Sequence, residues 1–335
     1  MRECQPDVSY YLDDRAQAIP FSLQIFGQVY WDQMTCMMTL PRYCQKPKAP
    51  PIKSQGIKTK LVPLILTSVK WEGKGRWIEP FLGSGVVLFN IQPDKALISD
   101  TNKHIIEIYQ AIQSGKISSD SLKIYLEKEG KKLESQGEKY YYQVRDRFND
   151  SGDPFDFIFL NHASFNGVIR FNSKGRFNVP FCKKVSRFRP AYITKICNQV
   201  AWVARVLHNK DWTFIVQDWK QAIRCVTSDD FVYLDPPYIG RHTDYFNNWT
   251  DANADELVES IKKLPCGFAY SMWKKNKYRE NEHLSKHFSC YPCVTYNHYY
   301  YVGSTQDLRN EMEEALIISP GFLATDDDLH PEEGR

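Results

Sequence analysis

The sequence predicts an α/β protein whose doubly wound, mostly parallel sheet is interrupted by an inserted helical module. Short apolar segments alternate with amphipathic ones from residue 76 to about 114, and the alternation resumes at residue 212. A glycine loop, FLGSG, follows the first apolar segment, as is typical of strand-to-helix turns in such folds. Between the two alternating regions lie about 100 residues of helical and basic character, a usual size for a domain.

Within the alternating regions, the expected strands are RWIEP, KALIS, WTFIVQD, DFVYLD, CGFAYSMW, CVTYNHYYYV and EALIIS. VVLFNI and TNKHIIEIYQAIQ are expected helices, and Thr101 is the expected N-cap of the second. The predicted division is an N-terminal extension that ends in a Pro- and Lys-rich linker (1–50), an α/β domain (51–114 and 212–320), an inserted domain (115–211) and an acidic tail (321–335). We expect residues 1 to about 48 to be dispensable.

The inserted module is strongly basic. It has 18 Lys and Arg residues against 10 Asp and Glu residues, a net charge of +8 in a chain whose formal net charge is +3. FNGVIRFNSKGRFNVPF alternates apolar and polar residues around Ser173–Gly175 and is expected to form a β-hairpin. From Phe165 to Pro190 there are seven basic residues and no acidic one. Such a patch indicates a polyanion partner, and the alternative is a solvated basic face.

Cysteine usage and hydropathy bear on the compartment. The nine cysteines are an odd number scattered along a long chain, which favours free thiols in a reducing compartment over a disulfide framework. No run of about 18 apolar residues predicts a membrane span, and the N-terminus lacks the pattern of a signal peptide. The expected location is the cytoplasm of a prokaryotic cell, with no membrane partner.

The segment DPPY, Asp235–Tyr238, follows the apolar strand FVYL. A carboxylate at the carboxyl end of a parallel strand lies where open α/β sheets bind ligands. Pro236 and Pro237 stiffen the turn, so that the Asp235 carboxylate and the Pro236 carbonyl become fixed acceptors for the two N–H donors of an exocyclic amino group. Tyr238 can stack on the base that carries this group. The alternative is a strand followed by an ordinary Pro-Pro turn.

The segment EPFLGSG, Glu79–Gly85, indicates a cofactor site. Gly83 and Gly85 allow the backbone to approach a ligand closely. A nicotinamide-binding pattern would need glycine at position 88, which is Leu88. Asp100 ends the next strand, where a carboxylate can accept hydrogen bonds from both hydroxyls of a ribose; the alternative for Asp100 is a solvated helix cap.

Taken in order, the glycine loop, the basic insert with its hairpin NGVIRFNSKGRFNVPF, and DPPY resemble the D12, or Dam, class of DNA adenine N6-methyltransferases. The resemblance runs from about Pro51 to Ser319. It implies a Rossmann-like methyltransferase sheet, S-adenosylmethionine as cofactor, and methylation of adenine N6 in double-stranded DNA after base flipping. It also implies a monomer that serves as the modification enzyme of a restriction–modification system, without a stable complex with the cognate restriction endonuclease.

The resemblance further implies roles for single residues. Lys58 would hold the cofactor carboxylate, and Phe171 would sit in or beside the base stack. The implied cofactor residues are Ser54, Lys58, Phe81, Gly83, Gly85, Asp100, Asp218 and Asp235; the base-holding residues are Asp235, Pro236, Pro237 and Tyr238; the DNA-binding residues are Arg170, Phe171, Asn172, Lys174, Arg176, Asn178 and Lys183. Relatives often have Trp at the position of Ser54, which leaves open how that side of the cofactor pocket closes.

Other activities remain open on the sequence. N4-cytosine methylation uses the same amino-group chemistry, but position 235 is Asp, not Ser. Transfer to a protein glutamine amide would be favoured by Asn at position 235. A DNA-binding protein that has lost catalysis is disfavoured by the intact Asp235, Tyr238 and Asp100.

We expect no metal. His283, His287, Cys290 and Cys293 have spacings that could suggest zinc, but the run crosses from an expected helix into an expected strand, and no remote ligand pair is obvious.

Overall fold

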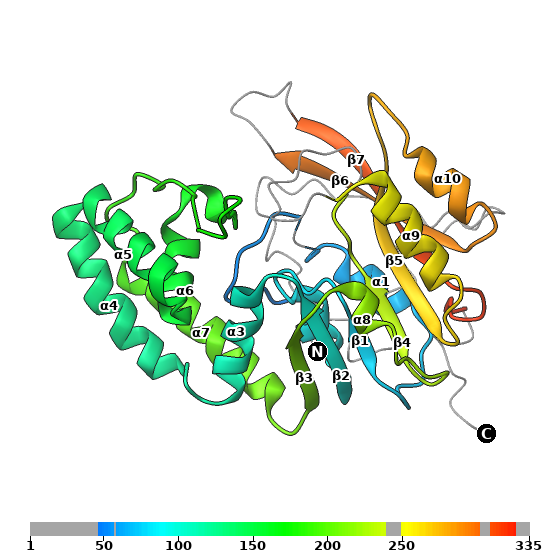
Figure 1. Ribbon diagram of the computed structural model, residues 1–335, viewed down its shortest axis with the longest axis horizontal. Helices are drawn as coiled ribbons and strands as arrows, with labels where there is room; N and C mark the ends of the chain where they lie inside the picture. The colour runs from blue at the N-terminus through cyan, green and yellow to red at the C-terminus, as the bar shows by residue number, and fades with distance from the viewer. Residues whose placement is uncertain (1–45, 57, 239–248, 302–308, 326–335) are drawn as a thin grey trace, which may run out of the picture.

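The computed structural model describes residues 46–325 except 57, 239–248 and 302–308. Seven strands form one sheet in the order β3-β2-β1-β4-β5-β7-β6 (Figure 1). The first five are parallel, and β7 runs antiparallel between β5 and β6. Their bounds are β1 Trp77–Glu79, β2 Lys95–Asp100, β3 Asp211–Val216, β4 Phe231–Leu234, β5 Gly267–Asn276, β6 Cys293–Tyr301 and β7 Arg309–Ile318. The expected doubly wound sheet is therefore present.

The central strands have continuous apolar sequences because both of their faces are buried. Trp77 stacks on Phe231 and Tyr233 on one face, with ring centroids 5.4 and 5.8 Å apart. Val232 and Leu234 point to the other face and join a second buried cluster. Each face thus has its own apolar core, which is what a sheet between two helical layers requires.

Helices cover both faces of the sheet. The apolar cluster on the face of Trp77, Phe231 and Tyr233 includes residues of three helices, α1 (Val62–Ser68), α2 (Val86–Ile91) and α3 (Lys103–Gln113). The second includes α8 (Trp219–Ala222), α9 (Asp251–Ile261) and α10 (Glu282–Phe288). The N-cap of α3 is Asn102, not Thr101 as expected, because the Asn102 side chain accepts from the backbone N–H of His104.

The inserted module consists of α4 (Ser119–Gln136), α5 (Glu138–Ser151), α6 (Pro154–Ala163), the short 3-10 helix η1 (Phe165–Gly167) and α7 (Pro190–Leu207), to the left of the sheet in Figure 1. Gly137, with φ of +62°, breaks the expected charged helical region into two helices. Arg147 of α5 binds the buried carboxylates of Glu129 in α4 and Asp156 in α6. The apolar core of the module continues into that of α3, so no flexible linker separates module and sheet.

Parts of the expected linker and of the expected tail contact the α/β domain. Lys48, in the expected linker, exchanges two backbone hydrogen bonds of 2.9 Å with the Asn90 side chain, and Pro50 and Pro51 are buried. Phe322, in the expected tail, packs on Phe231 with ring centroids 5.8 Å apart. These segments therefore pack against the α/β domain, through hydrogen bonds at Lys48 and ring contact at Phe322. The rest of the expected extension and tail, 1–45 and 326–335, lies outside the described residues.

The hairpin expected in the module is only partly regular. Single bridges pair Phe171 with Phe177 and Ser164 with Phe181. In this described segment, neither bridge extends into a ladder of several residue pairs. Among the described residues, no helix has the length and apolar character needed to cross a membrane.

Candidate active site

Polar side chains follow one edge of the sheet, where adjacent parallel strands end. Asp218 follows β3, Asp100 ends β2, Glu79 ends β1 and Asp235 follows β4, and these strands are neighbours in this order. Ser271 lies one residue beyond Tyr270, which pairs with Leu234 at the end of β4. The carboxyl edge of the sheet is therefore a continuous polar row, as expected of a ligand site in a doubly wound fold.

An ion pair between Lys58 and Asp235 lies at the centre of this row. The Lys58 Nζ is 2.9 Å from Asp235 Oδ1, and the two side chains are 6% and 22% exposed. Ser271 Oγ donates to the same Oδ1 at 2.9 Å. Lys58 also donates to the Gly56 carbonyl at 3.1 Å. The expected cofactor-binding lysine thus directly contacts the expected catalytic aspartate.

The two partners of this ion pair respond differently to burial. Burial acts to lower the pKa of Lys58, but the carboxylate of Asp235, together with smaller effects of nearby tyrosine and glutamate side chains, holds the pKa well above its ordinary value. Burial raises the pKa of Asp235, while the Lys58 ammonium and the Ser271 hydroxyl oppose that rise. Lys58 is therefore cationic at neutral pH and favours the ionised form of Asp235.

Tyr238, the last residue of DPPY, is fixed from two sides. Its ring lies 4.7 Å from the Lys58 Nζ, measured to the ring centroid. Its hydroxyl donates to Glu314 Oε1 of β7 at 3.1 Å, and both side chains are buried. The aromatic ring expected to face a base is thus held by a cation and by a carboxylate that the sequence analysis did not identify.

The two glycines of the glycine loop have different surroundings. Gly83 has φ of +52°, and a Cβ there would meet nothing within 4 Å, so its backbone adjoins open space. Gly85 has φ of +72°, and a Cβ there would come 2.9 Å from the Phe89 ring. Gly83 accordingly fits the expected close approach of a ligand, whereas Gly85 is required for packing of α2 and for its own backbone conformation.

Asp100 is held in position by the backbone. Its Oδ2 accepts from the Gly83 N–H at 3.0 Å, and its Oδ1 accepts from the Asn102 N–H at 2.8 Å. Burial raises the pKa of Asp100, and these backbone donors oppose the rise. Because each carboxylate oxygen can accept more than one hydrogen bond, Asp100 retains acceptor capacity for hydroxyl groups.

Glu79 was not among the expected site residues, although it begins the EPFLGSG motif. It is 2% exposed, and Trp77 Nε1 donates to its Oε2 at 3.1 Å. Burial, with a smaller effect of Asp235, raises the pKa of Glu79 to about 8. The carboxyl group is therefore mainly protonated at pH 7. A carboxyl residue ending a central strand was the signal that could have identified it.

Three expected cofactor residues have described contacts outside the group around Lys58 and Asp235. Asp218 caps α8 and accepts from the backbone N–H groups of Lys220 and Gln221. Phe81 packs edge-on against Trp249, with ring centroids 5.7 Å apart. Ser54 lines a cavity of about 270 Å³ beside His162 and Tyr192 of the inserted module. Ser54 thus faces the module, which leaves its expected contact with a cofactor a prediction.

The chain is similar to known DNA methyltransferases. A model of the D12 class N6 adenine-specific DNA methyltransferases matches residues 54–298. The type II methyltransferase M.MjaIII of Methanocaldococcus jannaschii is 31% identical over 232 residues, which cover 64% of this chain and 78% of that protein. The DNA adenine methylases of Serratia marcescens and Escherichia coli are each 28% identical, and the aligned parts span 57% and 66% of their lengths and 48% and 55% of this chain.

The chain belongs to the D12 class of N6 adenine-specific DNA methyltransferases. The family match spans the glycine loop, the inserted module and DPPY. The sheet described above is accordingly a methyltransferase sheet, as the sequence predicted.

In this D12 methyltransferase, several expected DNA-binding residues also hold the hairpin together. Asn172 Oδ1 accepts from the backbone N–H groups of Lys174 and Arg176, both at 3.0 Å, and so closes the turn. Arg170 Nε donates to Asn178 Oδ1 at 2.8 Å. Lys174, Arg176 and Lys183 are exposed, and Arg176 lies 3.2 Å from Asp150. The exposed cations fit DNA contact, whereas Asn172, Arg170 and Asn178 first shape the loop.

Two aromatic residues of the hairpin region differ in exposure. Phe171, expected beside the base stack, is half-buried and stacks on His104 of α3 with ring centroids 5.3 Å apart. Phe165 is 55% exposed, and its backbone N–H donates to the Pro180 carbonyl at 2.9 Å. The exposure of Phe165 could not be predicted from the sequence, because the exposure of a single aromatic residue is not visible in a local pattern.

The segment before Lys58 connects the module with the carboxyl edge of the sheet. Asn161 of α6 is fully buried, accepts from the Lys53 N–H at 2.8 Å and donates to the Lys53 carbonyl at 2.9 Å. His162 bonds to the Pro51 carbonyl at 2.8 Å. Burial, aided by Arg187, lowers the pKa of Lys53 to about 8. Five residues later, Lys58 of the same segment pairs with Asp235. One stretch of chain therefore contacts both the inserted module and the turn after β4.

Glu79 predicts a pH dependence of stability. Because its pKa is about 8 in the folded protein and 4.5 ordinarily, the folded state retains a proton that the unfolded state has released. This contribution to stability is full below about pH 4.5 and is lost as the pH rises to about 8, by up to ~1.4 kcal/mol per pH unit. Glu79→Gln should flatten the dependence, measured by urea unfolding between about pH 5 and 8.5.

The matched control is Glu127→Gln, an exposed glutamate of α4. It should leave the pH dependence of the wild type unchanged. Parallel stability profiles for wild type and Glu79→Gln would contradict the assignment.

Proposed function

We propose that this protein transfers a methyl group from S-adenosylmethionine to the N6 amino group of adenine in double-stranded DNA. The observation that carries the proposal is the asymmetric bonding of Asp235. Lys58 and Ser271 both bond to its Oδ1, and no described residue bonds to its Oδ2. An acceptor fixed in this way suits an amino group, which has two N–H donors and needs its lone pair directed at the incoming carbon.

The described residues fit an adenosyl cofactor. Asp100 presents a backbone-held carboxylate, and Gly83 adjoins open space where a side chain would stand. We assign the ribose to Asp100, the main-chain approach to Gly83, and supporting contacts to Phe81, Asp218 and Lys58. When bound, the cofactor supplies an electrophilic methyl group.

The protein contributes mainly orientation and charge. Asp235 Oδ2 and the Pro236 carbonyl each accept one N–H of the adenine amino group, which turns its lone pair toward the methyl carbon. The nitrogen becomes positive as it attacks, and the Asp235 carboxylate stabilises that charge in a water-poor site. Asp235 Oδ2 is also placed to receive the proton that leaves. Lys58 and Ser271 keep the carboxylate ionised and oriented, and Tyr238 stacks on the flipped base.

We assign DNA binding to the exposed face of the hairpin region. Lys174, Arg176 and Lys183 supply phosphate or guanine contacts. We propose Phe165, in place of Phe171, as the aromatic residue that stacks on DNA bases, because Phe165 is exposed and Phe171 already stacks on His104. We further propose that the enzyme acts as a monomer in a prokaryotic cytoplasm and is the modification partner of a restriction endonuclease.

Asp235→Ala should lower the rate of methyl transfer at least ~100-fold, because one acceptor and the local negative charge are both lost. Cofactor affinity should fall less than about tenfold. The measurement is single-turnover transfer of labelled methyl to duplex DNA, with cofactor binding followed by calorimetry. Asp211→Ala, an exposed aspartate at the start of β3, is the control. Turnover close to wild type in Asp235→Ala would exclude the mechanism.

Phe165→Ala should weaken DNA binding by about 1–3 kcal/mol without changing stability, since stacking of a base on an aromatic ring is lost. Phe171→Ala should instead lower the free energy of unfolding, because its ring packs inside the protein. Fluorescence anisotropy with labelled duplex and urea unfolding separate the two effects. Ile124→Ala, at an exposed apolar position of α4, is the control. The assignment fails if Phe165→Ala binds DNA normally.

The recognition sequence is proposed from resemblance. PPIKSQGIKTKLVP, IRFNSKG, FNVPFCKK, AYITKI, DPPYIGRH and DYFN are similar to segments of the EcoRV modification methyltransferase. Two of these segments lie in the hairpin region, where base readout is expected. We therefore expect methylation of an adenine in a palindrome that begins with GA, GATATC first and GATC second. Single-molecule sequencing of DNA from cells that express the protein tests this; modification at a motif without GA would reject it.

A further inference from the structure

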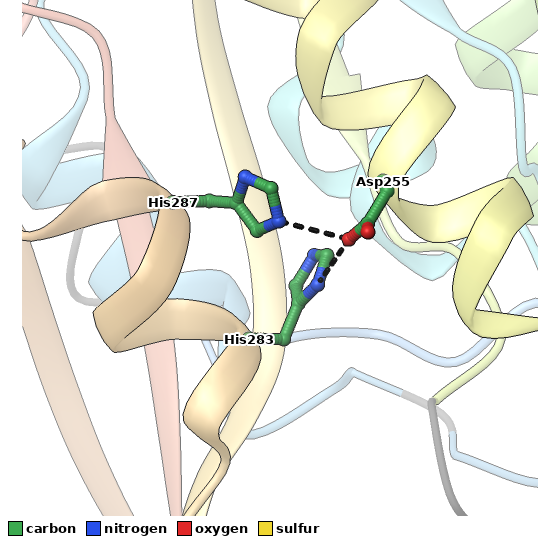
Figure 2. A group of neighbouring side chains, drawn as sticks. All are labelled: Asp255, His283 and His287. Carbon is green, nitrogen blue, oxygen red and sulfur yellow. Dashed lines mark hydrogen bonds and ion pairs between the residues drawn. The ribbon is translucent and has the colours of Figure 1, made fainter.

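Three potential metal ligands meet between α9 and α10, on the face of the sheet that carries the second apolar cluster. Asp255 comes from α9, and His283 and His287 come from α10 (Figure 2). The two histidines are four residues apart, so their side chains share one face of the helix. Histidines at this spacing on a helix form half of many zinc sites.

The ligand atoms converge. His287 Nε2 lies 2.8 Å and His283 Nδ1 lies 3.3 Å from the same oxygen, Asp255 Oδ1. One ligand atom from each residue lies within 4.8 Å of the other two. In a tetrahedral zinc site with bonds of about 2.0–2.2 Å, neighbouring ligand atoms stand ~3.3 Å apart. The distances of the two nitrogens from Asp255 Oδ1 are therefore close to the spacing of ligand atoms in such a site.

His283 supplies an independent reason to expect a ligand. Its side chain is 8% exposed, and its Nε2 is buried without a hydrogen-bond partner among the described residues. The 3.3 Å from its Nδ1 to Asp255 is longer than the usual N–H···O hydrogen bond. A buried imidazole normally finds good partners at its ring nitrogens. This one is directed at Asp255 and His287 with neither nitrogen well satisfied.

The surroundings also suit a metal ion. Glu259, one turn after Asp255, places Oε1 at 3.8 Å from His287 Nδ1, the outer nitrogen of a histidine whose Nε2 faces the site. A carboxylate behind a ligating histidine is a usual second contact in zinc proteins. Lys286 binds Asp255 Oδ2 at 2.8 Å and leaves Oδ1 to the site. The Asp255 side chain is 40% exposed, so water can fill a fourth position.

We propose that Asp255, His283 and His287 bind a divalent transition-metal ion, zinc in the first place, which fastens α10 to α9. Two imidazoles and one carboxylate favour zinc and its neighbours over magnesium or calcium, which prefer all-oxygen sites. The ion takes no part in methyl transfer. It stiffens α9, whose N-cap Thr250 is preceded by Trp249, the residue that packs on Phe81 of the glycine loop.

The cysteines that share this sequence region are not part of the proposed site. Among the described residues, the only potential ligands that group together are Asp255, His283 and His287. Cys290 is exposed and contacts Ser289, and Cys293 begins β6. The proposal thus departs from the expectation of no metal, which considered the two histidines only with the nearby cysteines; Asp255 lies 28 positions before His283.

The test uses the full-length protein, freed of metal with a chelator and titrated with Zn²⁺ and with Co²⁺. The wild type should bind one equivalent of Zn²⁺ at a site that also gives a visible Co²⁺ d–d band without a thiolate charge-transfer band. Binding should raise the melting temperature by at least ~2 °C. Asp255→Asn and His287→Gln should each weaken Zn²⁺ binding at least tenfold and abolish the Co²⁺ band.

Cys290→Ser and His208→Gln are the matched controls, a neighbouring thiol and a histidine at the exposed end of α7. Both should bind metal as the wild type does. Circular dichroism of each metal-free variant establishes that it is folded, and His283→Gln provides a third variant if one is not. The proposal is overturned if a folded variant of Asp255 or His287 retains wild-type affinity, if Cys290→Ser loses the ion, or if the wild type binds no ion at one equivalent.

Discussion

The buried ion pair between Lys58 and Asp235 is the constraint on which the active edge depends. Taking two charges out of water costs several kcal/mol per ion, so the pair persists only where further polar contacts surround it. Here Gly56 and Ser271 supply them, and the Tyr238 ring faces the ammonium. The turn after β4, the strand β5 and the segment before α1 must therefore all be in place before Asp235 can be ionised and oriented.

The same ion pair joins the inserted module to the carboxyl edge of the sheet through the chain that carries Lys58. Lys53 is fixed to Asn161 of the inserted module, and five residues later Lys58 reaches Asp235. Five residues span at most ~18 Å, so the module cannot lie far from the turn that carries Asp235. Because His162 also bonds to the Pro51 carbonyl, this spacing is held by buried hydrogen bonds at several points along the segment. The module and the carboxyl edge of the sheet are thus joined through the contacts of Pro51, Lys53 and Lys58.

The two faces of the sheet are covered by different sets of helices with separate apolar cores. The face covered by α1, α2 and α3 continues into the module, so its core supports the surface that we propose binds DNA. The face covered by α8, α9 and α10 has a separate core. Asp255 and the two histidines of α10 belong to the helices that cover that second face. A metal there would reinforce the scaffold of the active edge without entering its chemistry.

The sequence by itself determined the order of strands and helices, the insertion, and the positions of Asp235, Asp100 and Gly83 at strand ends, because hydrophobic periodicity and glycine or proline turns are local properties of the chain. Only the tertiary structure decided which residues join them. Ser271, Glu314 and Asp255 come from elements far along the chain, and their roles depend on which strands and helices become neighbours. The structure likewise shows that Phe165 is exposed whereas Phe171 is half-buried. It also shows that Gly85 packs against Phe89 whereas Gly83 adjoins open space. Burial and long-range pairing arise from the packed core as a whole, so no local pattern of residues could have specified them.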